Sequence, residues 1–479
     1  MKHYDAIIIG AGAAGLMCAA VASKRGRKVL LIEHSQKIGE KIRISGGGRC
    51  NFTNIHTTPK NFISQNPHFA VSALQRFTAE DFIAMVEKHQ IAFHEKTLGQ
   101  LFCDFSSQQI IDMLLRECKD GGVEILLETL AKNIKEIEKK SQSDNLNLEA
   151  SGPSHLADKG LNAATENISH RNFTLKIENK NADEALTEQV SCQSLIIATG
   201  GLSIPKMGAT SFGYDIARKF GVKIIEPFPA LVPLTLDKST LEVSKNLAGV
   251  AVEAIVSCAI ESDLASFTSA SANFTISPQP AASFGNKGAI ARIISFREAI
   301  LFTHRGLSGP AILQISSYLQ KGQEITINMA PDHNIYDILI VEKKQKPKQE
   351  IITILNKYLP KSLASYILQN HLNTDKKSSL EPLPQNSAVW IADISNQKLQ
   401  EIANRINAFK LQPEGTEGYA KAEVTAGGVD TNEISSKTFE CKSVQGLYFI
   451  GELLDVTGHL GGFNFQWAWS CGHAAGEAV

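Results

Sequence analysis

The chain opens with two short apolar runs on either side of an Ala-rich run, a pattern that predicts a strand, a helix and a second strand. Residues 4–9 (YDAIII) and 29–32 (VLLI) have the length and apolar content of buried strands. Residues 16–25 are typical of a helix that stops before Gly26, and the second strand ends at Glu33. This alternation indicates an α/β fold whose sheet begins within the first ten residues.

A glycine-rich turn joins the first predicted strand to the helix. Gly10 permits a tight turn, Gly12 lets the backbone approach a pyrophosphate, and Gly15 lets the helix lie close to the strand. Free N–H groups at the start of the helix would face the phosphates, and the helix dipole favours their negative charge. Glu33 lies about 20 residues beyond the glycines, where it can accept from ribose hydroxyls. The unit predicts a dinucleotide site; a glycine turn without a ligand is the alternative.

A second glycine-rich segment, SGGGRCNFTN at residues 45–54, follows Lys41 and suits a close approach to the same ligand. Its glycines expose the backbone, and Arg49 and Asn51 add a fixed cation and an amide. The segment follows the acidic end of the second strand, where loops line the crevice of a Rossmann-type sheet. A flexible surface loop is the alternative interpretation.

Two segments in the first half of the chain extend the prediction to a flavin nucleotide. Residues 122–127 are expected to form a strand, after which the backbone near Ala131 would pass the adenine ring. Residues 194–198 form a buried strand that runs into Thr199, Gly200 and Gly201. Glycines at this point let the chain cross close to a nucleotide without a side-chain clash.

The C-terminal segment supplies the last elements of the predicted flavin site. A strand at residues 446–450 ends in Gly451 and Glu452, whose carboxylate is suited to accept from a ribityl hydroxyl. Gly461 and Gly462 then open a helix whose N-terminus can stabilise negative charge on the pyrimidine end of a reduced flavin. The candidate cofactor-binding residues are Gly10, Gly12, Ala13, Ala14, Gly15, Glu33, Lys41, Gly46, Gly47, Gly48, Arg49, Asn51, Ala131, Thr199, Gly200, Gly201, Gly451, Glu452, Gly461, Gly462, Phe463 and Asn464.

Several segments together resemble a known family. They are residues 10–15, 45–54, 198–221, 303–316, 422–429 and 451–476. The chain is similar to the bacterial FAD-binding flavoproteins of the BaiN-like or aminoacetone-oxidase type, which are NAD(P)/FAD-dependent oxidoreductases, and the similarity spans nearly its whole length. The resemblance implies tightly bound FAD in a Rossmann-like, glutathione-reductase-type α/β domain, made discontinuous by a β-barrel-like insert and a small helical insert. It supplies no substrate.

The spacing of hydrophobic residues along the chain predicts the same division into an FAD domain, a β-rich insert and a helical insert. Prolines and glycines punctuate strand-like runs from about residue 222, and a helical period follows from residue 334. The expected parts are residues 1–210 and 422–479 for the FAD domain, 211–333 for the β-rich insert, 334–407 for the helical insert and 408–421 for a strand returning to the β-rich insert. We expect the insert to lie over the cofactor, with the substrate pocket between them. Residues 139–170 and 262–282 are polar or Ser/Ala-rich and are expected to be surface excursions.

Composition limits the partners, the cellular location and the cysteine chemistry that we expect for this protein. The formal net charge of −1 gives no global electrostatic argument for a nucleic acid or anionic membrane partner. No apolar run has the ~20 residues of a membrane span, and the first strand begins too early to leave room for a signal peptide, so we expect a cytoplasmic protein. Eight widely spaced cysteines predict neither a metal site nor a disulfide framework.

The residues that perform the chemistry are not assigned by the sequence. Cys50 could approach the flavin, but the second cysteine of a disulfide reductase is missing from its neighbourhood, and simple packing is the alternative. His304 and Arg305 are candidates for a pocket wall or for surface capping. His459 could move a proton near the flavin. The tryptophans at 467 and 469 are expected to pack the terminal helix.

Three functions are compatible with this sequence. We favour an FAD-dependent oxidoreductase acting on a small organic molecule, with NAD(P)H or O2 left open as the electron partner. An RNA-modifying flavoprotein is the second hypothesis, although the near-neutral charge argues against a nucleic acid partner. A flavin-binding regulatory protein without turnover is the third.

Overall fold

The computed structural model describes residues 1–138, 171–180, 187–260, 274–278, 292–372 and 389–479. The predicted excursion at residues 139–170 lies outside the described residues, as does most of the one at 262–282. Residues 274–278 of the latter form strand β14 (Phe274–Pro278), which pairs with β15 (Arg292–Thr303). That part of the Ser/Ala-rich segment therefore belongs to a sheet, because its alternating apolar residues fit a pleated surface.

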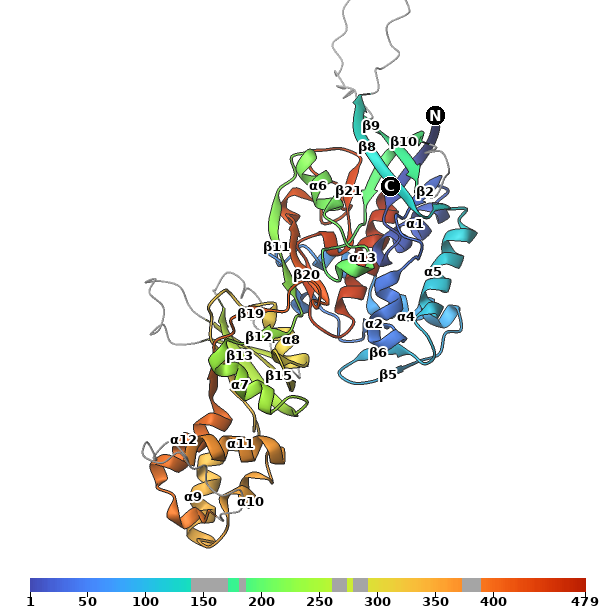
Figure 1. The fold of residues 1–479 in the computed structure, drawn as a ribbon. Helices are drawn as coiled ribbons and strands as arrows, with labels where there is room; N and C mark the ends of the chain where they lie inside the picture. The colour runs from blue at the N-terminus through green and yellow to red at the C-terminus, as the bar shows by residue number, and fades with distance from the viewer. Residues whose placement is uncertain (139–170, 181–186, 261–273, 279–291, 373–388) are drawn as a thin grey trace, which may run out of the picture.

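A parallel sheet forms the centre of the larger part of the molecule (Figure 1). In spatial order its strands are β7 (Glu124–Leu126), β2 (Val29–Ile32), β1 (Lys2–Ile9), β10 (Thr187–Ile197) and β21 (Leu447–Phe449). Ile8 lies opposite both Leu31 and Ile196, and Ile196 lies opposite Tyr448. A strand from near the C-terminus thus joins the sheet that the first residues begin.

The first half of β10 pairs with an antiparallel strand in addition to its parallel pairing with β1. Its residues 187–192 pair antiparallel with β9 (Arg171–Asn179), which in turn pairs with β8 (Thr129–Glu138). β10 therefore connects the parallel sheet to an antiparallel ribbon, and Ala131 of that ribbon is brought toward the end of β2.

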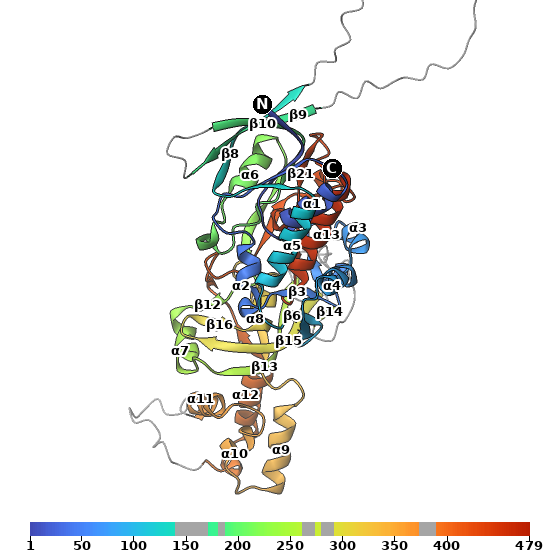
Figure 2. The ribbon, with the colours of Figure 1, turned by 90° about the vertical axis from the view of Figure 1, so that its right-hand side faces the viewer.

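Helices α1 (Ala13–Lys24), α5 (Gln108–Asp120) and α13 (Phe463–Ala478) pack together against the sheet (Figures 1 and 2). α1 and α13 approach closely because small residues meet between them: a Cβ atom on Gly472 would lie 2.5 Å from the carbonyl oxygen of Ala14. The last helix of the chain is thereby fixed against the first.

Shorter elements complete this part of the molecule and lie around the sheet and helices. They are α2 (Glu40–Gly48), β3 (Asn51–Asn54), η1 (Pro59–Asn61), β4 (Phe62–Ile63), α3 (Val71–Arg76), α4 (Ala79–Lys88), β5 (Phe93–Glu95), β6 (Gln100–Cys103), η2 (Pro205–Met207), α6 (Phe212–Lys219), η6 (Thr431–Glu433), η7 (Gly451–Leu453) and β22 (Thr457–Gly458).

A two-stranded ribbon leads from this part to a second sheet. It consists of β11 (Ile224–Ala230) and β20 (Val424–Val429), which pair antiparallel. The second sheet has the order β18 (Phe409–Leu411), β17 (Ile325–Asn328), β13 (Ala251–Ile260), β15, β16 (Gly306–Ser308), β12 (Leu234–Thr235) and β19 (Gly415–Thr416), with β14 on β15 and with α7 (Lys238–Asn246) and α8 (Pro310–Ser316) beside it. Its pairings are antiparallel, as the run of short strands predicts.

A helical part occupies the far end of the molecule in both views (Figures 1 and 2). It contains α9 (Ile335–Gln345), α10 (Ile351–Leu355), α11 (Lys361–Leu372), η5 (Ile391–Asp393) and α12 (Asn396–Asn407). The chain leaves the second sheet after β17 and returns as β18, and these two strands pair directly. The helical part is therefore an insertion between two neighbouring strands.

The predicted fold class is confirmed: an α/β Rossmann-type part is interrupted by a β-rich part and a helical part. The domain boundaries remain predictions. Tyr214 and Ala217 of α6 pack in the core of the Rossmann-type part, which would move the boundary expected at residue 211 toward β11. In the described part of the chain we find no helix with the length and apolar character of a membrane span.

Candidate functional site

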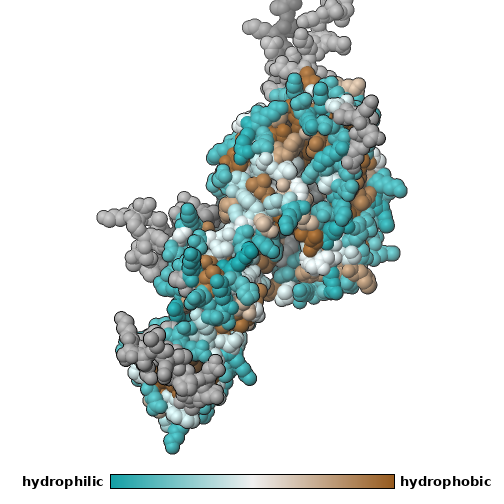
Figure 3. All heavy atoms as spheres, in the orientation of Figure 1, coloured by the Kyte–Doolittle hydropathy of each residue, from teal (hydrophilic) through white to brown (hydrophobic). Residues whose placement is uncertain are grey.

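A cavity of about 960 Å³ lies at the carboxyl ends of the parallel strands. Ile9, Ile32 and Ala198, which end or follow β1, β2 and β10, contribute to its walls. This is the edge of a doubly wound sheet where ligands bind, because loops diverge there and helix N-termini point toward it. Figure 3 shows one face of the molecule as mainly hydrophilic with scattered apolar side chains.

The turn after β1 has the geometry that its three glycines predict. Gly10 has φ of +110°, and a Cβ atom on it would lie 2.4 Å from the carbonyl oxygen of Ala198. A Cβ atom on Gly15 would lie 1.9 Å from the carbonyl oxygen of Gly10. A Cβ atom on Gly12, by contrast, would meet no described atom within 4 Å, since Gly12 faces the cavity. The turn thus leaves space for a ligand at the N-terminus of α1.

Glu33 lies at the end of β2 and is held as an acceptor. Its Oε2 accepts from the backbone N–H of Ala11 at 2.8 Å, and its Oε1 accepts from the N–H of Ser35 at 3.0 Å. His34 Nδ1 lies 3.0 Å from the same Oε1. Burial alone would raise the pKa of Glu33, but these hydrogen bonds outweigh it and keep the pKa below its usual value. The carboxylate therefore stays ionised at the cavity wall.

The second glycine segment forms a non-helical kink at the end of α2, just before β3. Gly46 and Gly47 have φ of 58° and 67°, and both line the cavity together with Asn51. Gly48 and Arg49 do not line it, and Arg49 is exposed to solvent. The left-handed residues turn the chain so that only the first two glycines face the cavity, which the sequence pattern did not resolve.

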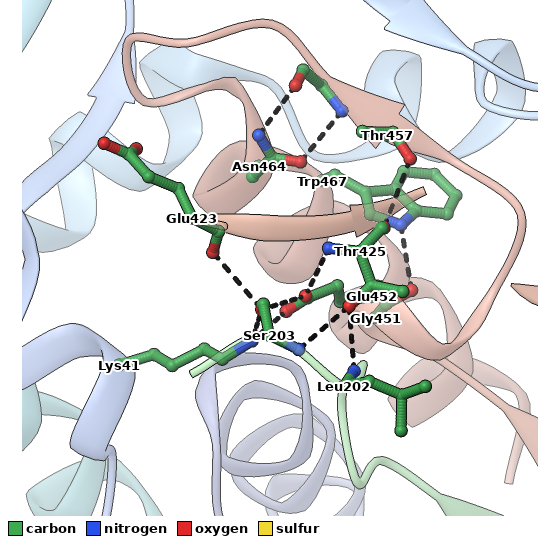
Figure 4. A network of polar contacts seen from close by, with 11 residues as sticks. Lys41, Leu202, Ser203, Glu423, Thr425, Gly451, Glu452, Thr457, Asn464 and Trp467 are labelled. Atoms are coloured by element: carbon green, nitrogen blue, oxygen red, sulfur yellow. Dashed lines mark hydrogen bonds and ion pairs between the residues drawn. The ribbon is translucent and has the colours of Figure 1, made fainter. Parts of the chain in front are cut away.

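A network of polar contacts connects Lys41 on α2 with Glu452 at the end of β21 (Figure 4). Lys41 Nζ donates to Oε2 of Glu452 at 2.7 Å and to Oγ of Ser203 at 2.6 Å. Glu452 Oε1 accepts from Ser203 Oγ at 2.9 Å and from the backbone N–H of Thr425 at 3.0 Å. Thr425 Oγ1 accepts from the N–H of Leu202 at 2.8 Å and of Ser203 at 3.0 Å. The carboxylate predicted to meet a ribityl hydroxyl is thus oriented by three protein donors.

The start of α13 forms the opposite wall of the cavity. Gly462 has φ of +96°, and a Cβ atom on it would lie 2.5 Å from the carbonyl oxygen of Thr53. Asn464 Nδ2 donates to the carbonyl of Gly458 at 2.8 Å, and its Oδ1 accepts from the N–H of the same residue at 2.8 Å. Phe463 turns away from the cavity to pack edge-on against Phe62. The helix start is therefore rigid before any ligand binds.

Most of the predicted cofactor-binding residues line this one cavity. They are Gly10, Gly12, Ala13, Ala14, Glu33, Lys41, Gly46, Gly47, Asn51, Ala131, Thr199, Gly200, Gly201, Gly451, Glu452, Gly461, Gly462 and Asn464. The predicted residues that do not line it are Gly15, Gly48, Arg49 and Phe463. Gly15 instead fills the role predicted for it, close contact between helix and strand.

The insert does not cover the cavity as the sequence led us to expect. Within the described residues, none between 232 and 422 lines it. The second sheet is attached through the β11–β20 ribbon and extends away from the Rossmann-type part (Figure 1). It reaches the cavity edge through α8, where Gln314 Oε1 accepts from the N–H of Leu460 at 2.9 Å.

The residues considered as candidates for the chemistry, Cys50, His304 and Arg305, do not line the cavity. Cys50 is fully buried, does not line the cavity, and burial raises the pKa of its thiol, so the packing interpretation holds. His304 and Arg305 lie exposed in the turn between β15 and β16 and do not line the cavity, so neither forms a wall of this pocket.

His459 is buried at the edge of the cavity without lining it. Its Nε2 lies 2.6 Å from the hydroxyl of Tyr318 on the insert, and burial lowers its pKa to about 3. It is therefore neutral and joins the two parts of the molecule. Trp467 and Trp469 are buried and donate to the carbonyls of Gly451 and Phe52, which agrees with their predicted packing role.

Sequence reasoning missed several residues of the site. Ser203 and Thr425 hold Glu452, and Leu231 and Glu423 line the cavity from the β11–β20 ribbon. Ser203 lies in a loop, Thr425 in β20, and Leu231 and Glu423 directly beside β11 and β20; none of them belongs to a distinctive motif, so only the folded arrangement brings them to the site. The cysteines are all unpaired, and the described residues contain no cluster of three His, Cys, Asp or Glu side chains arranged to hold a metal ion.

Comparison with known proteins identifies the family. The family model described as the HI0933-like protein Rossmann domain matches residues 4–161 and 154–478. The chain therefore belongs to the HI0933-like family, an FAD-binding family with a Rossmann-type domain. The residues fit that cofactor: the space at Gly12 suits a pyrophosphate, and the ionised Glu33 suits a ribose.

Three relatives that match this chain along nearly its whole length carry two different names. Ribosomal RNA dihydrouridine synthase of Escherichia coli is 43% identical over 477 residues, which cover 100% of this chain and 98% of that protein. The protein of the same name from Haemophilus influenzae is 39% identical and covers 100% of this chain and 99% of its own length. The 3-dehydro-bile acid delta(4,6)-reductase of Clostridium scindens is 24% identical, with 98% of each chain covered.

Proposed function

We propose that this member of the HI0933-like family is an FAD-dependent oxidoreductase that reduces uridine in ribosomal RNA to dihydrouridine. The observation that carries the proposal is the 43% identity to a ribosomal RNA dihydrouridine synthase over the whole of this chain. The second relative of that name matches over the same length. An identity that covers the Rossmann-type part, the β-rich part and the helical part alike favours a shared substrate as well as a shared cofactor.

The proposed reaction suits the chemistry of a flavin site. Reduction of uridine adds two electrons and two protons across the C5=C6 bond, which is conjugated to the C4 carbonyl. FAD, once reduced, supplies a hydride for such a bond. The chain would hold the adenosine end beside Glu33, the pyrophosphate at the start of α1, and the ribityl region beside Glu452. The protein must then orient the base, exclude water and provide the proton.

The expectation that no nucleic acid binds rested on the net charge of the whole chain. That charge is unevenly distributed: residues 334–407 contain 10 Lys and Arg against 7 Asp and Glu, while the whole chain has 48 against 49. Lys344 and Lys348, at the end of α9 and just beyond it, are exposed. A basic insert supports contact with RNA phosphates even where the total charge is near zero.

Reduction of a small unsaturated carbonyl compound is the second candidate function. The match to a bile acid reductase over 98% of both chains favours it, although the identity is only 24%. Both candidates require the same chemistry, addition of a hydride and a proton across a polarised C=C bond. They differ in whether a polynucleotide must reach the cavity.

The test is an assay with the purified FAD-loaded protein and ribosomal RNA that lacks dihydrouridine. We would add NADH or NADPH, digest the RNA and measure dihydrouridine by mass spectrometry, with reactions lacking the nicotinamide as the control. The proposal predicts dihydrouridine that depends on both the protein and a reductant. If the RNA stays unmodified while enones of steroid size reoxidise the reduced flavin, the second candidate replaces the first.

A further inference from the structure

Glu423 lines the cavity and is not among the residues expected to hold the cofactor. It directly precedes β20. Its backbone is fixed on both sides: the N–H donates to the carbonyl of Leu231 at 3.2 Å, and the carbonyl accepts from Ser203 Oγ at 3.3 Å. Its side chain is therefore presented to the cavity from a rigid strand end.

The other carboxylates that line the cavity have partners. Glu33 and Glu452 accept the hydrogen bonds described above. Glu40 accepts from Arg43 Nε at 3.1 Å, and Asp215 pairs with Arg218 at 3.0 Å. The carboxyl group of Glu423 has no hydrogen-bond or ion-pair partner among the described residues, and Figure 4 shows it pointing away from the network around Ser203.

Glu423 lies at the end of the cavity where the reacting ring is expected. The residue after it, Val424, packs in one small apolar cluster with Leu231, and Leu460 packs against that cluster. Leu460 is followed directly by Gly461 and Gly462, the start of α13 that is suited to the pyrimidine end of a flavin. The carboxyl group of Glu423 is thus on the side of the cavity that a substrate must reach.

The surroundings of Glu423 favour its protonated form. Desolvation within the cavity raises its pKa above the usual value of a glutamate. Ser203, which donates to the backbone carbonyl of Glu423, also contacts Lys41 and Glu452, and these two charged groups are paired with each other. A carboxyl group whose pKa is raised keeps its proton to a higher pH than an ordinary glutamate does, and it can act as a proton donor.

We propose that Glu423 is the general acid of the reduction, donating a proton to C5 of the uracil ring. This inference rests on the proposed function. Because C6 is the β-carbon of the unsaturated carbonyl, bound reduced FAD would supply a hydride to C6, and the electron pair of the C5=C6 bond would take the proton from the Glu423 carboxyl group. Two electrons and two hydrogens are thereby added, and the resulting carboxylate is reprotonated from solvent. A reduced nicotinamide dinucleotide, the reductant that this proposal names, would return the flavin to its reduced form.

The test compares the wild-type holoenzyme with Glu423→Gln, which keeps the shape of the side chain and removes the acid. Glu414→Gln, at an exposed position outside the cavity, is the matched control. The first readout does not depend on turnover: infrared difference spectra of the two holoenzymes against pH should show a carboxylic acid band in the wild type that persists to higher pH than that of an ordinary glutamate and is absent in Glu423→Gln. FAD content and the rate of flavin reduction by the nicotinamide should be unchanged.

The second readout is the rate of dihydrouridine formation at saturating RNA. Glu423→Gln should lower it about 100-fold or more, the range for loss of a general acid. The wild-type rate should fall as the pH rises through the pKa of Glu423, and the variant should lack that decline. A variant with full rate, or an infrared band that is unchanged by the substitution, overturns the role of Glu423. A wild-type enzyme that leaves RNA unmodified overturns the proposed function instead.

Discussion

Lys41 Nζ lies 2.7 Å from Oε2 of Glu452, an ion pair between residues that are 411 positions apart in the chain. Lys41 stands on α2, directly after the first strand–helix–strand unit, and Glu452 follows the last strand of the same sheet. Their side chains are only 31% and 18% exposed. The two ends of the chain thus meet at the cavity wall, where the pair positions a carboxylate that sequence reasoning assigned to the cofactor.

The first prediction concerns that carboxylate. Glu452→Ala should weaken FAD binding roughly tenfold or more, since a hydrogen bond to a charged group contributes about 1.5–3 kcal/mol. The loss of its acceptor sites also frees Lys41 and Ser203 to move. FAD dissociation on dilution, followed by flavin fluorescence, measures the change.

Glu253→Gln on the second sheet, far from the cavity, is the control and should keep wild-type affinity. Retention of FAD by Glu452→Ala equal to that of the control would mean that the carboxylate serves only the protein network.

The second prediction separates two glycines of the same turn. Gly12→Val should leave the fold intact but lower FAD occupancy, because Gly12 has φ of −82° and its Cβ atom would enter the cavity. Gly15→Val should destabilise the fold itself by about 1–3 kcal/mol or more, because its Cβ atom would overlap the carbonyl oxygen of Gly10.

Thermal unfolding of the FAD-free proteins and flavin absorbance of the purified ones distinguish the two effects. A Gly12→Val protein that folds and retains full FAD would show that no part of the cofactor passes this residue.

The parts of the site that depend on local backbone geometry could be predicted from sequence. Gly10 and Gly12 act through a turn whose conformation is fixed by a few neighbouring residues, so their spacing alone locates the cavity. The same holds for Gly451 and Gly462, which follow a strand and open a helix. Such positions need special φ values or close approach, and glycine marks both.

The parts that depend on distant pairing could not be predicted. Ser203 and Glu423 meet the cavity only because β20 pairs with β11 and returns beside the end of β10. Arg49 follows a glycine run that turns it toward solvent, and nothing in its residue type reveals that direction. The net charge of the whole chain was also a poor guide to a nucleic acid partner. It is a sum over all residues and does not reveal that residues 334–407 carry more basic than acidic side chains.

The third prediction concerns His459 and pH. Burial lowers its pKa from 6.5 to about 3, so below pH 6.5 the unfolded chain binds a proton that the folded protein does not. Stability contributed by this group is present above pH 6.5 and is lost as the pH falls toward 3, at up to about 1.4 kcal/mol per pH unit. His459→Gln should remove that slope, as measured by urea unfolding at several pH values.

Tyr318→Phe is the matched control because it removes the hydroxyl near Nε2 and leaves His459 buried. It should keep the wild-type slope at lower overall stability. The contribution of Asp455, whose pKa is raised to about 6, has the opposite sign but cancels between the proteins compared. Equal slopes in wild type and His459→Gln would show that His459 is protonated in the folded state.

The last prediction compares two deletions. A fragment of residues 1–420 keeps the glycine turn and Glu33 but lacks β20, β21 and α13, so β10 loses its pairing with β21 and α1 loses its packing against α13. It should not hold FAD. Replacing residues 330–407 with a short glycine-rich turn should retain FAD, because β17 and β18 pair directly and no described residue of that segment lines the cavity.

Flavin content per polypeptide after gel filtration tests both expectations. A soluble 1–420 fragment with stoichiometric FAD would remove the C-terminal segment from the cofactor site, whereas loss of FAD from the internal deletion would show that the helical part supports the cavity from a distance.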